Sequence, residues 1–255
     1  MKKGIGLLAA FTLTLTSLCA VFSASAAERP TDGKVVQDYN SFTENEILDH
    51  NSNEAQLKIT AGGIDGSAAL QITPKNGGAS LGNLTFWGDY FSYIFGSAIQ
   101  EGSVDLTKYD GFMFYVKNVT AGAELSIQLN KVMYGDRGVW AHMGKGVQVF
   151  GADGSDKTAD ILQPMGDTEY KFVFPETFEG WLVFPAKVAD NKDDVTAGFY
   201  SKDGLEDLTL ADVQEINFWG NEKTHLTIDN VTLYGGDEET PSTAKPSPSR
   251  LINDF

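Results

Sequence analysis

Short apolar runs with two-residue alternation constrain the fold of this chain more than any other feature. Between residues 35 and 235, runs rich in β-branched and aromatic residues are separated by Gly, Asp and Asn. Apolar residues at a sustained 3.6-residue spacing, which would indicate helices, are almost absent from this region. The pattern predicts an all-β fold, an antiparallel β-sandwich of the jelly-roll type.

Several segments have clear strand character, and about nine strands in one unit fit a single sandwich. The segments are 56–60, 68–73, 111–117, 124–130, 147–150, 170–174, 181–184, 215–219 and 226–234.

The first 27 residues have the layout of a secretory signal peptide. Two lysines precede an apolar run over residues 5–22, and the small residues 24–27 follow it. Threonines and serines dilute the run, and no stop-transfer charge follows it, so a membrane anchor is disfavoured. We expect cleavage near Ala26 or Ala27 and a secreted, extracellular product.

The rest of the chain divides into two parts. Residues 28–236 are predicted to form the β-sandwich domain, and residues 237–255 a Pro/Ser/Thr-rich disordered linker or tail. Such a linker normally joins modules, so we expect a longer natural protein with an appended catalytic module. The only cysteine, Cys19, lies in the signal peptide, and a thiol-free secreted chain with a Met-Lys-Lys start is typical of a bacterial exoprotein.

The charge balance excludes one class of partner. The chain has 35 Asp and Glu against 19 Lys and Arg, a formal charge of −16 that becomes −18 when Lys2 and Lys3 leave with the signal peptide. Binding to a nucleic-acid backbone needs a basic surface, so nucleic acid is not an expected partner. We expect a monomer with no membrane attachment, whose acids supply oxygen ligands for a cation such as calcium.

Alternation along three of the strands places polar and aromatic side chains opposite the apolar face. If these strands share a sheet, its outer face gathers rings and amides. The residues on that side are Tyr115, Gln128, Asn130, Asn217 and Trp219.

Further aromatic residues are predicted on loops beside this face. Trp87 and Asp89 lie in an aromatic loop over residues 86–93, and Tyr134 and Trp140 lie in the loop that follows the strand 124–130. Exposed aromatic residues on loops usually contact a ligand or a partner.

Rings and amides together suit a sugar, because the C–H faces of a sugar stack on aromatic rings while its hydroxyls bond to amides. We therefore predict polysaccharide binding along a shallow cleft. The expected stacking residues are Tyr115, Trp219, Tyr134, Trp140 and Trp87, and the expected hydrogen-bonding residues are Gln128, Asn130, Asn217 and Asp89. The alternative is that Tyr115 and Trp219 are covered by a loop and form a small satellite core.

Blocks of sequence spread over residues 35–234 keep a shared order and spacing. The blocks are 35–39, 66–72, 105–117, 180–185, 208–218 and 226–234. In this order they resemble galactose-binding-like jelly-roll carbohydrate-binding modules, in particular those similar to family 11. The resemblance implies non-catalytic binding of plant or microbial polysaccharide by a module usually attached to a glycoside hydrolase, with Trp181 in a structural role.

The resemblance also implies a structural calcium ion between the first and last strands, near Asp229 and Asp38. Carboxylate and carbonyl oxygens suit this cation. Asn40 stands where relatives often have a glutamate, and Asn230 where a second aspartate is frequent.

The sequence offers little for catalysis. No strand carries the pair of alternating acids of jelly-roll hydrolases, the three histidines lack zinc-site spacing, and no Gly-x-Ser-x-Gly elbow occurs. Lys131, Tyr134, Arg137 and His142 lie close together in the sequence and leave a polysaccharide lyase as the catalytic alternative, beside a hydrolase domain. A surface scaffold or adhesion domain without a sugar ligand is the third interpretation.

Overall fold

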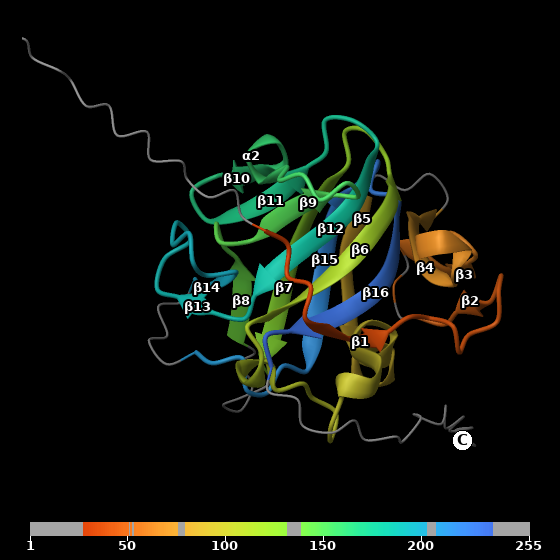
Figure 1. Cartoon of the computed structure of the whole chain (residues 1–255), viewed down its shortest axis with the longest axis horizontal. Helices are drawn as coiled ribbons and strands as arrows, with labels where there is room; N and C mark the ends of the chain where they lie inside the picture. The colour runs from red at the N-terminus through yellow and green to blue at the C-terminus, as the bar shows by residue number, and fades with distance from the viewer. Residues whose placement is uncertain are drawn as a thin grey trace, which may run out of the picture.

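Two eight-stranded sheets pack face to face in the computed structural model (Figure 1). The structure describes residues 28–50, 52, 54–75, 80–131, 139–202 and 208–236. The predicted signal peptide and the predicted linker therefore lie outside the described residues. The strands pair antiparallel except β13 and β14, which pair in parallel, so the predicted β-sandwich is confirmed.

Sheet A has the order β2-β3-β4-β16-β6-β12-β9, and β1 pairs with β16. Its strands are β1 (Gly33–Gln37), β2 (Ile47–Leu48), β3 (Ala55–Thr60), β4 (Ala69–Pro74), β6 (Gly111–Val119), β9 (Gln148–Gly151), β12 (Phe178–Pro185) and β16 (Leu226–Tyr234).

Sheet B has the order β10-β11-β7-β8-β14-β13, and β15 pairs with both β7 and β5. Its strands are β5 (Ser80–Trp87), β7 (Glu124–Lys131), β8 (Val139–Met143), β10 (Leu162–Met165), β11 (Glu169–Val173), β13 (Val188–Ala189), β14 (Phe199–Ser201) and β15 (Glu215–Asn221).

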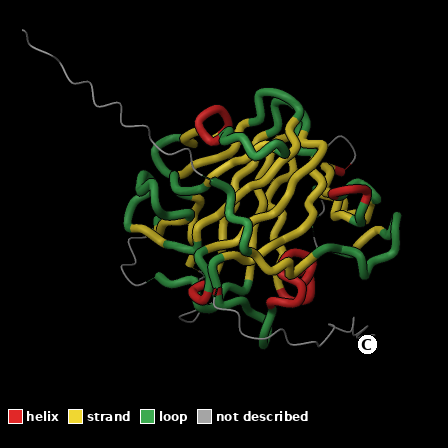
Figure 2. Tube along the Cα trace, in the orientation of Figure 1, coloured by secondary structure: helices red, strands yellow, loops and turns green. Residues whose placement is uncertain are grey.

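The helices of the described residues are single turns at the rim of the sheets (Figure 2). They are η1 (Ile64–Gly66), η3 (Gly88–Phe91), α1 (Ser92–Phe95), η4 (Gly96–Ala98), η5 (Leu106–Lys108) and α2 (Thr158–Ile161). Within the described part of the chain, no helix has the length and apolar character needed to cross a membrane.

Phenylalanine side chains form much of the core between the sheets. Phe112 and Phe184 of sheet A stack with ring centroids 4.8 Å apart, and Phe114 of sheet A lies 6.1 Å from Phe218 of sheet B. All four rings are fully buried. Alternation along each strand turns these rings inward and therefore turns the intervening residues toward solvent.

The nine predicted strands are all present, but two tryptophans predicted on loops lie in strands. Trp140 lies within β8, and Trp87 is the last residue of β5. The condition that three strands share one sheet also fails. The strand that carries Tyr115, β6, belongs to sheet A, whereas β7 and β15 are neighbours in sheet B.

The outer face of sheet A carries a second apolar cluster. Met113, Phe150 and Val183 are buried there, and Trp181 packs against them. The residues before β1 run across this face in front of β12 (Figure 1), and the Arg29 guanidinium lies 4.6 Å from the centre of the Trp181 ring. This cation–π contact and the buried cluster beneath it fit the structural role expected for Trp181.

Candidate functional site

The outer face of sheet B gathers most of the predicted binding residues. Its central strand, β7, pairs along one edge with β15, and along the other edge with β11 and then β8. Because these pairs are antiparallel and in register, outward side chains from neighbouring strands line up in rows that run across the sheet. Successive rows lie about 7 Å apart along each strand.

The first row, which we call the tryptophan row, has an indole at each end. Trp87 pairs with Glu215, Glu215 with Asn130, and Asn130 with Trp140, across the strands β5, β15, β7 and β8. The Asn130 Nδ2 atom donates to Glu215 Oε2 at 2.6 Å. The buried Oδ1 atom of Asn130 has no hydrogen-bond partner among the described residues.

The second row, which we call the amide row, crosses five strands. Thr85 pairs with Asn217, Asn217 with Gln128, Gln128 with His142, and His142 with Tyr200. With strands about 4.8 Å apart, this row spans about 19 Å.

A third row begins at Trp219, which lies opposite Ser126 of β7. The Ser126 hydroxyl donates to the backbone carbonyl of Tyr170 at 3.1 Å, and the Trp219 ring is only partly buried. Three tryptophans, on β5, β8 and β15, therefore lie on this face, with polar side chains between them.

The rings of this face are more accessible than its amides. Trp87 is 47% exposed, and Trp140 and Trp219 are partly exposed, whereas Asn130 and Asn217 are only 5% and 4% exposed. The alternative in which Trp219 is covered by a loop is therefore not what the structure shows. The partly exposed rings provide stacking surfaces for a ligand, and the buried amides between them provide hydrogen-bonding groups at the surface of the sheet.

The structure groups six of the nine predicted binding residues on the sheet B face: Trp87, Trp140, Trp219, Gln128, Asn130 and Asn217. Asp89 is exposed in η3, two residues beyond Trp87. Tyr134 lies outside the described residues.

Tyr115 does not belong with this group, and its placement corrects the prediction. It points outward from sheet A, on the opposite side of the sandwich, where it is 6% exposed. Its hydroxyl donates to Glu179 Oε1, and its ring meets that of Trp181 edge-on at 5.3 Å. Burial and the hydrogen bond to Glu179 raise the pKa of Tyr115, so the hydroxyl remains a donor.

Sequence reasoning missed several polar members of the sheet B face: Thr85, Glu169, Glu215 and Tyr200. It placed His142 only in a catalytic cluster. The alternation of Trp140 and His142 with Val139, Ala141 and Met143 is a strand signal that could have placed His142 beside Gln128.

The Glu169 carboxylate joins β11 to the amide row. Its Oε2 atom accepts hydrogen bonds from Gln128 Nε2 and from His142 Nδ1, both at 3.1 Å. Burial alone would raise the pKa of Glu169, but the bonds from His142 and Gln128 outweigh it and hold the pKa below its ordinary value. Glu169 is therefore a carboxylate at neutral pH, although it is only 8% exposed.

Tyr200 ends the amide row with its ring centroid 5.8 Å from that of His142. Burial and then the charge of Glu169 raise the pKa of Tyr200 to about 12. Its hydroxyl has no hydrogen-bond partner among the described residues, so a buried donor beside His142 is left unused.

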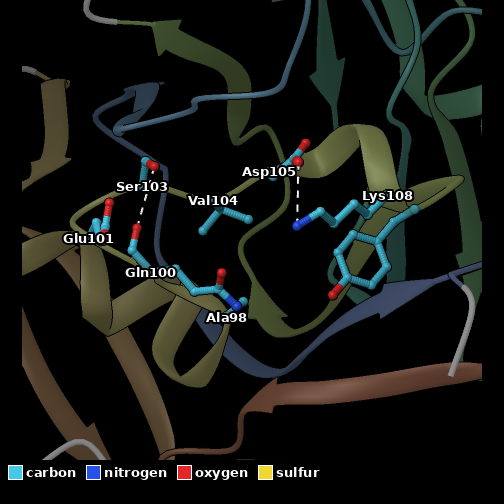
Figure 3. A pocket seen from close by; sticks show the side chains of 8 residues that line it. Ala98, Gln100, Glu101, Ser103, Val104, Asp105 and Lys108 are labelled. Atoms are coloured by element: carbon cyan, nitrogen blue, oxygen red, sulfur yellow. Dashed lines mark hydrogen bonds and ion pairs between the residues drawn. The ribbon is translucent and has the colours of Figure 1, made fainter. Parts of the chain in front are cut away.

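Two hollows open in the described surface, and His50, which lines the second, has its Nε2 atom 3.1 Å from the backbone oxygen of Thr85. One, of about 420 Å³, lies between η4 and η5 and is lined by polar residues such as Gln100, Glu101 and Asp105 (Figure 3). The other, of about 290 Å³, lies beside β2 and β3. Neither contains a residue of the three rows, so the candidate site is an open face rather than one of these hollows.

The two predicted calcium ligands, Asp229 and Asp38, have different surroundings in the structure. Asp229 is buried, but its oxygens accept from the Ile64 and Asn230 amides and from the Ser67 hydroxyl at 2.7–2.8 Å. Two of these donors bond to Oδ2 and one to Oδ1, so three hydrogen bonds from the protein already stabilise this carboxylate. Asp38 is exposed and accepts from the Asn40 amide at 3.1 Å.

The surroundings of Asp229 offer little to a metal. No group of three or more His, Cys, Asp or Glu that could hold a metal ion occurs in the described parts of the chain. The hydroxyl of Tyr39 is buried without a partner there, but burial, with the charge of Asp229, raises its pKa far above its ordinary value. A neutral phenol is a poor substitute for the carboxylate and carbonyl oxygens that calcium prefers.

We therefore expect chelation to have little effect on stability. Dialysis against EGTA should shift the melting temperature by less than about 2 °C. A bound calcium ion would stabilise the folded state by several kcal/mol at saturation, and its removal would give a much larger shift. Differential scanning calorimetry in EGTA and in a molar excess of calcium over protein measures the shift. A fall of about 5 °C or more in EGTA, reversed by calcium and not by magnesium, would show that the folded protein binds calcium and would contradict this expectation.

Of the four residues in the candidate lyase cluster, the structure describes the side chain of His142. The side chains of Lys131, Tyr134 and Arg137 lie outside the described residues. His142 is the remaining member of the lyase cluster, and its Nδ1 atom is bonded to Glu169. Glu179, the second residue of β12, accepts from the Tyr115 hydroxyl and lies 3.6 Å from the Lys117 ammonium.

Comparison with known proteins gives likeness in structure only. No family model matches the sequence, and no curated protein matches it. The chain is similar in structure to carbohydrate-binding modules. For a family 11 module from Clostridium thermocellum, in complex with a β-1,3-1,4-mixed-linked tetrasaccharide, the identity is 13% and the TM-score 0.44, over 82% of this chain and 99% of that one.

Two further solved structures show a similar likeness. A family 30 carbohydrate-binding module has 10% identity and a TM-score of 0.41, over 82% of this chain and 90% of that one. An exo-β-agarase has the same identity and TM-score, but the match covers only 26% of its chain. Identities this low carry no residue roles or ligands to the present chain.

Proposed function

We propose that this chain is a non-catalytic module that binds a polysaccharide on the outer face of sheet B. The observation that carries the proposal is the presence on that face of Trp87, Trp140 and Trp219 around rows of amides in cross-strand register. A sugar ring stacks its C–H face on an indole while its hydroxyls bond to neighbouring amides and carboxylates. A row of about 19 Å suits a chain of sugars better than a single one.

The charge of the chain favours a neutral glycan. The formal charge is −16 before cleavage and −18 after it, and Glu169 and Glu215 lie on the proposed face. Negative potential at the site opposes the approach of a polyanion. Uronic-acid polymers such as alginate and pectate should therefore bind more weakly than neutral polysaccharides.

The setting of the module forms part of the proposal. We propose that it is secreted from a bacterial cell through the signal peptide, acts as a monomer, and belongs to a larger glycan-degrading protein. The sequence supports this through the apolar amino-terminal segment and the Pro/Ser/Thr-rich residues after the domain.

Affinity electrophoresis of residues 28–236 against a panel of neutral and anionic polysaccharides tests the proposal. Retarded migration without release of product supports a binding module. Release of unsaturated products that absorb in the ultraviolet would support the lyase alternative, and reducing ends without unsaturation a hydrolase. Unchanged migration on every glycan would leave the scaffold interpretation.

Trp219→Ala should raise the dissociation constant obtained from the retardation by about tenfold, because a stacking ring contributes about 1.4 kcal/mol. The melting temperature should change little, because the Trp219 ring is partly exposed on the outer face of the sheet. Trp181→Phe, on the opposite face of the sandwich, is the matched control and should bind as the unmodified protein does. Equal binding by Trp219→Ala would remove Trp219 from the site.

A further inference from the structure

A continuous chain of hydrogen bonds runs along the amide row. The Thr85 hydroxyl donates to Asn217 Oδ1 at 3.3 Å, and Asn217 Nδ2 donates to Gln128 Oε1 at 3.3 Å. Gln128 Nε2 then donates to Glu169 Oε2 at 3.1 Å. Side chains from β5, β15, β7 and β11 thus form one connected network.

One group in this network, the Glu169 carboxylate, can act only as a hydrogen-bond acceptor. An ionised carboxylate can only accept hydrogen bonds, so Glu169 requires Gln128 to present its NH₂ group. The Gln128 oxygen must then face Asn217, which in turn presents its own NH₂ group to Gln128 and its oxygen to Thr85. A single charge therefore determines which way both amides point, and which lone pairs and protons remain for a ligand.

The same carboxylate selects the tautomer of His142. Glu169 Oε2 lies 3.1 Å from His142 Nδ1, so the Nδ1 atom carries the proton that it donates. Gln128 Nε2 lies 3.2 Å from this nitrogen, and with Nδ1 protonated the two nitrogens are both donors that converge on Glu169. The Nε2 atom of a neutral His142 is then left as an acceptor for a ligand hydroxyl.

The ionisable groups around Glu169 are compatible with a charged carboxylate that accepts from Gln128 and His142. Tyr200, beside His142, carries a neutral phenol at physiological pH. The Lys202 ammonium helps to stabilise the charge of Glu169. Lys171, two residues after Glu169 in β11, is paired instead with Glu124 at 2.8 Å.

We propose that Glu169 is a positioning residue that fixes the donor and acceptor pattern of the sheet B face, with His142 Nε2 as an acceptor for a sugar hydroxyl. This inference rests on the proposed function, because the pattern matters only if a ligand contacts the amide row. Glu169 acts through Gln128 and His142 and does not itself need to contact the glycan.

The first test needs no ligand. Long-range ¹H–¹⁵N correlation spectra of residues 28–236 report which nitrogen of His142 carries the proton. We expect the Nδ1–H tautomer at pH 8 in the unmodified protein and a shift toward Nε2–H or a mixture in Glu169→Gln. Nε2–H in the unmodified protein would overturn the inference, whatever the glycan result.

The second test measures binding to a glycan that the unmodified protein retains. Glu169→Gln keeps the size of the side chain but lets it donate as well as accept, so both amides lose their fixed orientation. We expect about a tenfold loss of affinity, the scale of one charge-assisted hydrogen bond. Glu179→Gln is the matched control, since it makes the same change on the outer face of sheet A.

The outcomes separate this inference from the proposed function. Unchanged affinity in Glu169→Gln, with the unmodified protein bound to glycan, would overturn the positioning role and leave the binding function standing. Failure of the unmodified protein to bind any glycan would refute the proposed function, and the His142 tautomer would still decide whether Glu169 orients the row. If Glu169→Gln does not fold, the spectrum of the unmodified protein decides the same point.

Discussion

Replacing Trp140 and Trp219 together by alanine should lower glycan affinity by about 100-fold. Each of these partly exposed indoles is expected to contribute about 1.4 kcal/mol by stacking, which is a factor of ten in the dissociation constant. Trp140 lies in the tryptophan row and Trp219 in the third row, with β7 between their strands. They share no contact within the described residues, so their effects should add.

Additivity in this variant measures the length of the ligand. Strand spacing and rise place the two rings on the order of 15 Å apart, so a glycan that contacts both must be an oligosaccharide. If one sugar ring were the whole ligand, the double variant would bind no more weakly than one of the single variants. Isothermal titration with the singles, the double and Trp181→Phe gives the comparison directly.

Stability supplies the second check on the same variant. Because both rings are partly exposed on the outer face of sheet B, we expect the melting temperature of the double variant to fall by less than about 5 °C. A much larger fall would show that the indoles pack as core. The loss of binding would then report unfolding rather than stacking, and the case for a tryptophan-lined face would fail.

The direction of each side chain could be predicted from sequence, but the sheet to which a strand belongs could not. Strands β6 and β15 show the same alternation, with Tyr115 and Trp219 outward and phenylalanines inward. Both residues do point away from the core, yet from opposite sides of the sandwich. Alternation is local, whereas sheet membership depends on pairings between segments far apart in the sequence.

The network around Glu169 lay beyond sequence reasoning for the same reason. Glu169 is the first residue of a short strand, and nothing near it in the sequence indicates Gln128 or His142 as a partner. Its contacts come from β7 and β8, whose relation to β11 is fixed only when the sheet forms. Trp140 is different. The alternation of apolar and polar residues over residues 139–143 does indicate a strand, but the segment is only five residues long and is easily taken for a loop.

The largest effect on stability is expected at Asp229, on the other sheet. Its carboxylate is 1% exposed and accepts from the Ile64 amide, the Ser67 hydroxyl and the Asn230 amide. Asp229→Ala leaves these donors without their acceptor, at a cost of about 3–5 kcal/mol. For a domain of this size the melting temperature should fall by roughly 10 °C.

The loop around Gly63 approaches Asp229 closely, and an asparagine at position 229 cannot replace all the hydrogen bonds of the aspartate. A Cβ atom on Gly63 would lie 2.4 Å from Asp229 Oδ2, so this glycine permits the close approach that brings the Ile64 amide to the carboxylate. Asp229→Asn keeps the shape but can accept on one side only, because its NH₂ group must face one of the donors. We expect Asp229→Asn to lose part of the stability that Asp229→Ala loses.

Thermal unfolding of Asp229→Ala and Asp38→Ala, each with calcium and with EGTA, separates two origins of this stability. If hydrogen bonds to the protein hold the carboxylate, Asp229→Ala is destabilised equally in both conditions, and Asp38→Ala, at an exposed position, changes by less than about 0.5 kcal/mol. If calcium links the first and last strands, both variants lose stability in calcium and neither differs much from the unmodified protein in EGTA. The geometry favours the first result, because a carboxylate surrounded by N–H and O–H donors has its charge balanced without a cation.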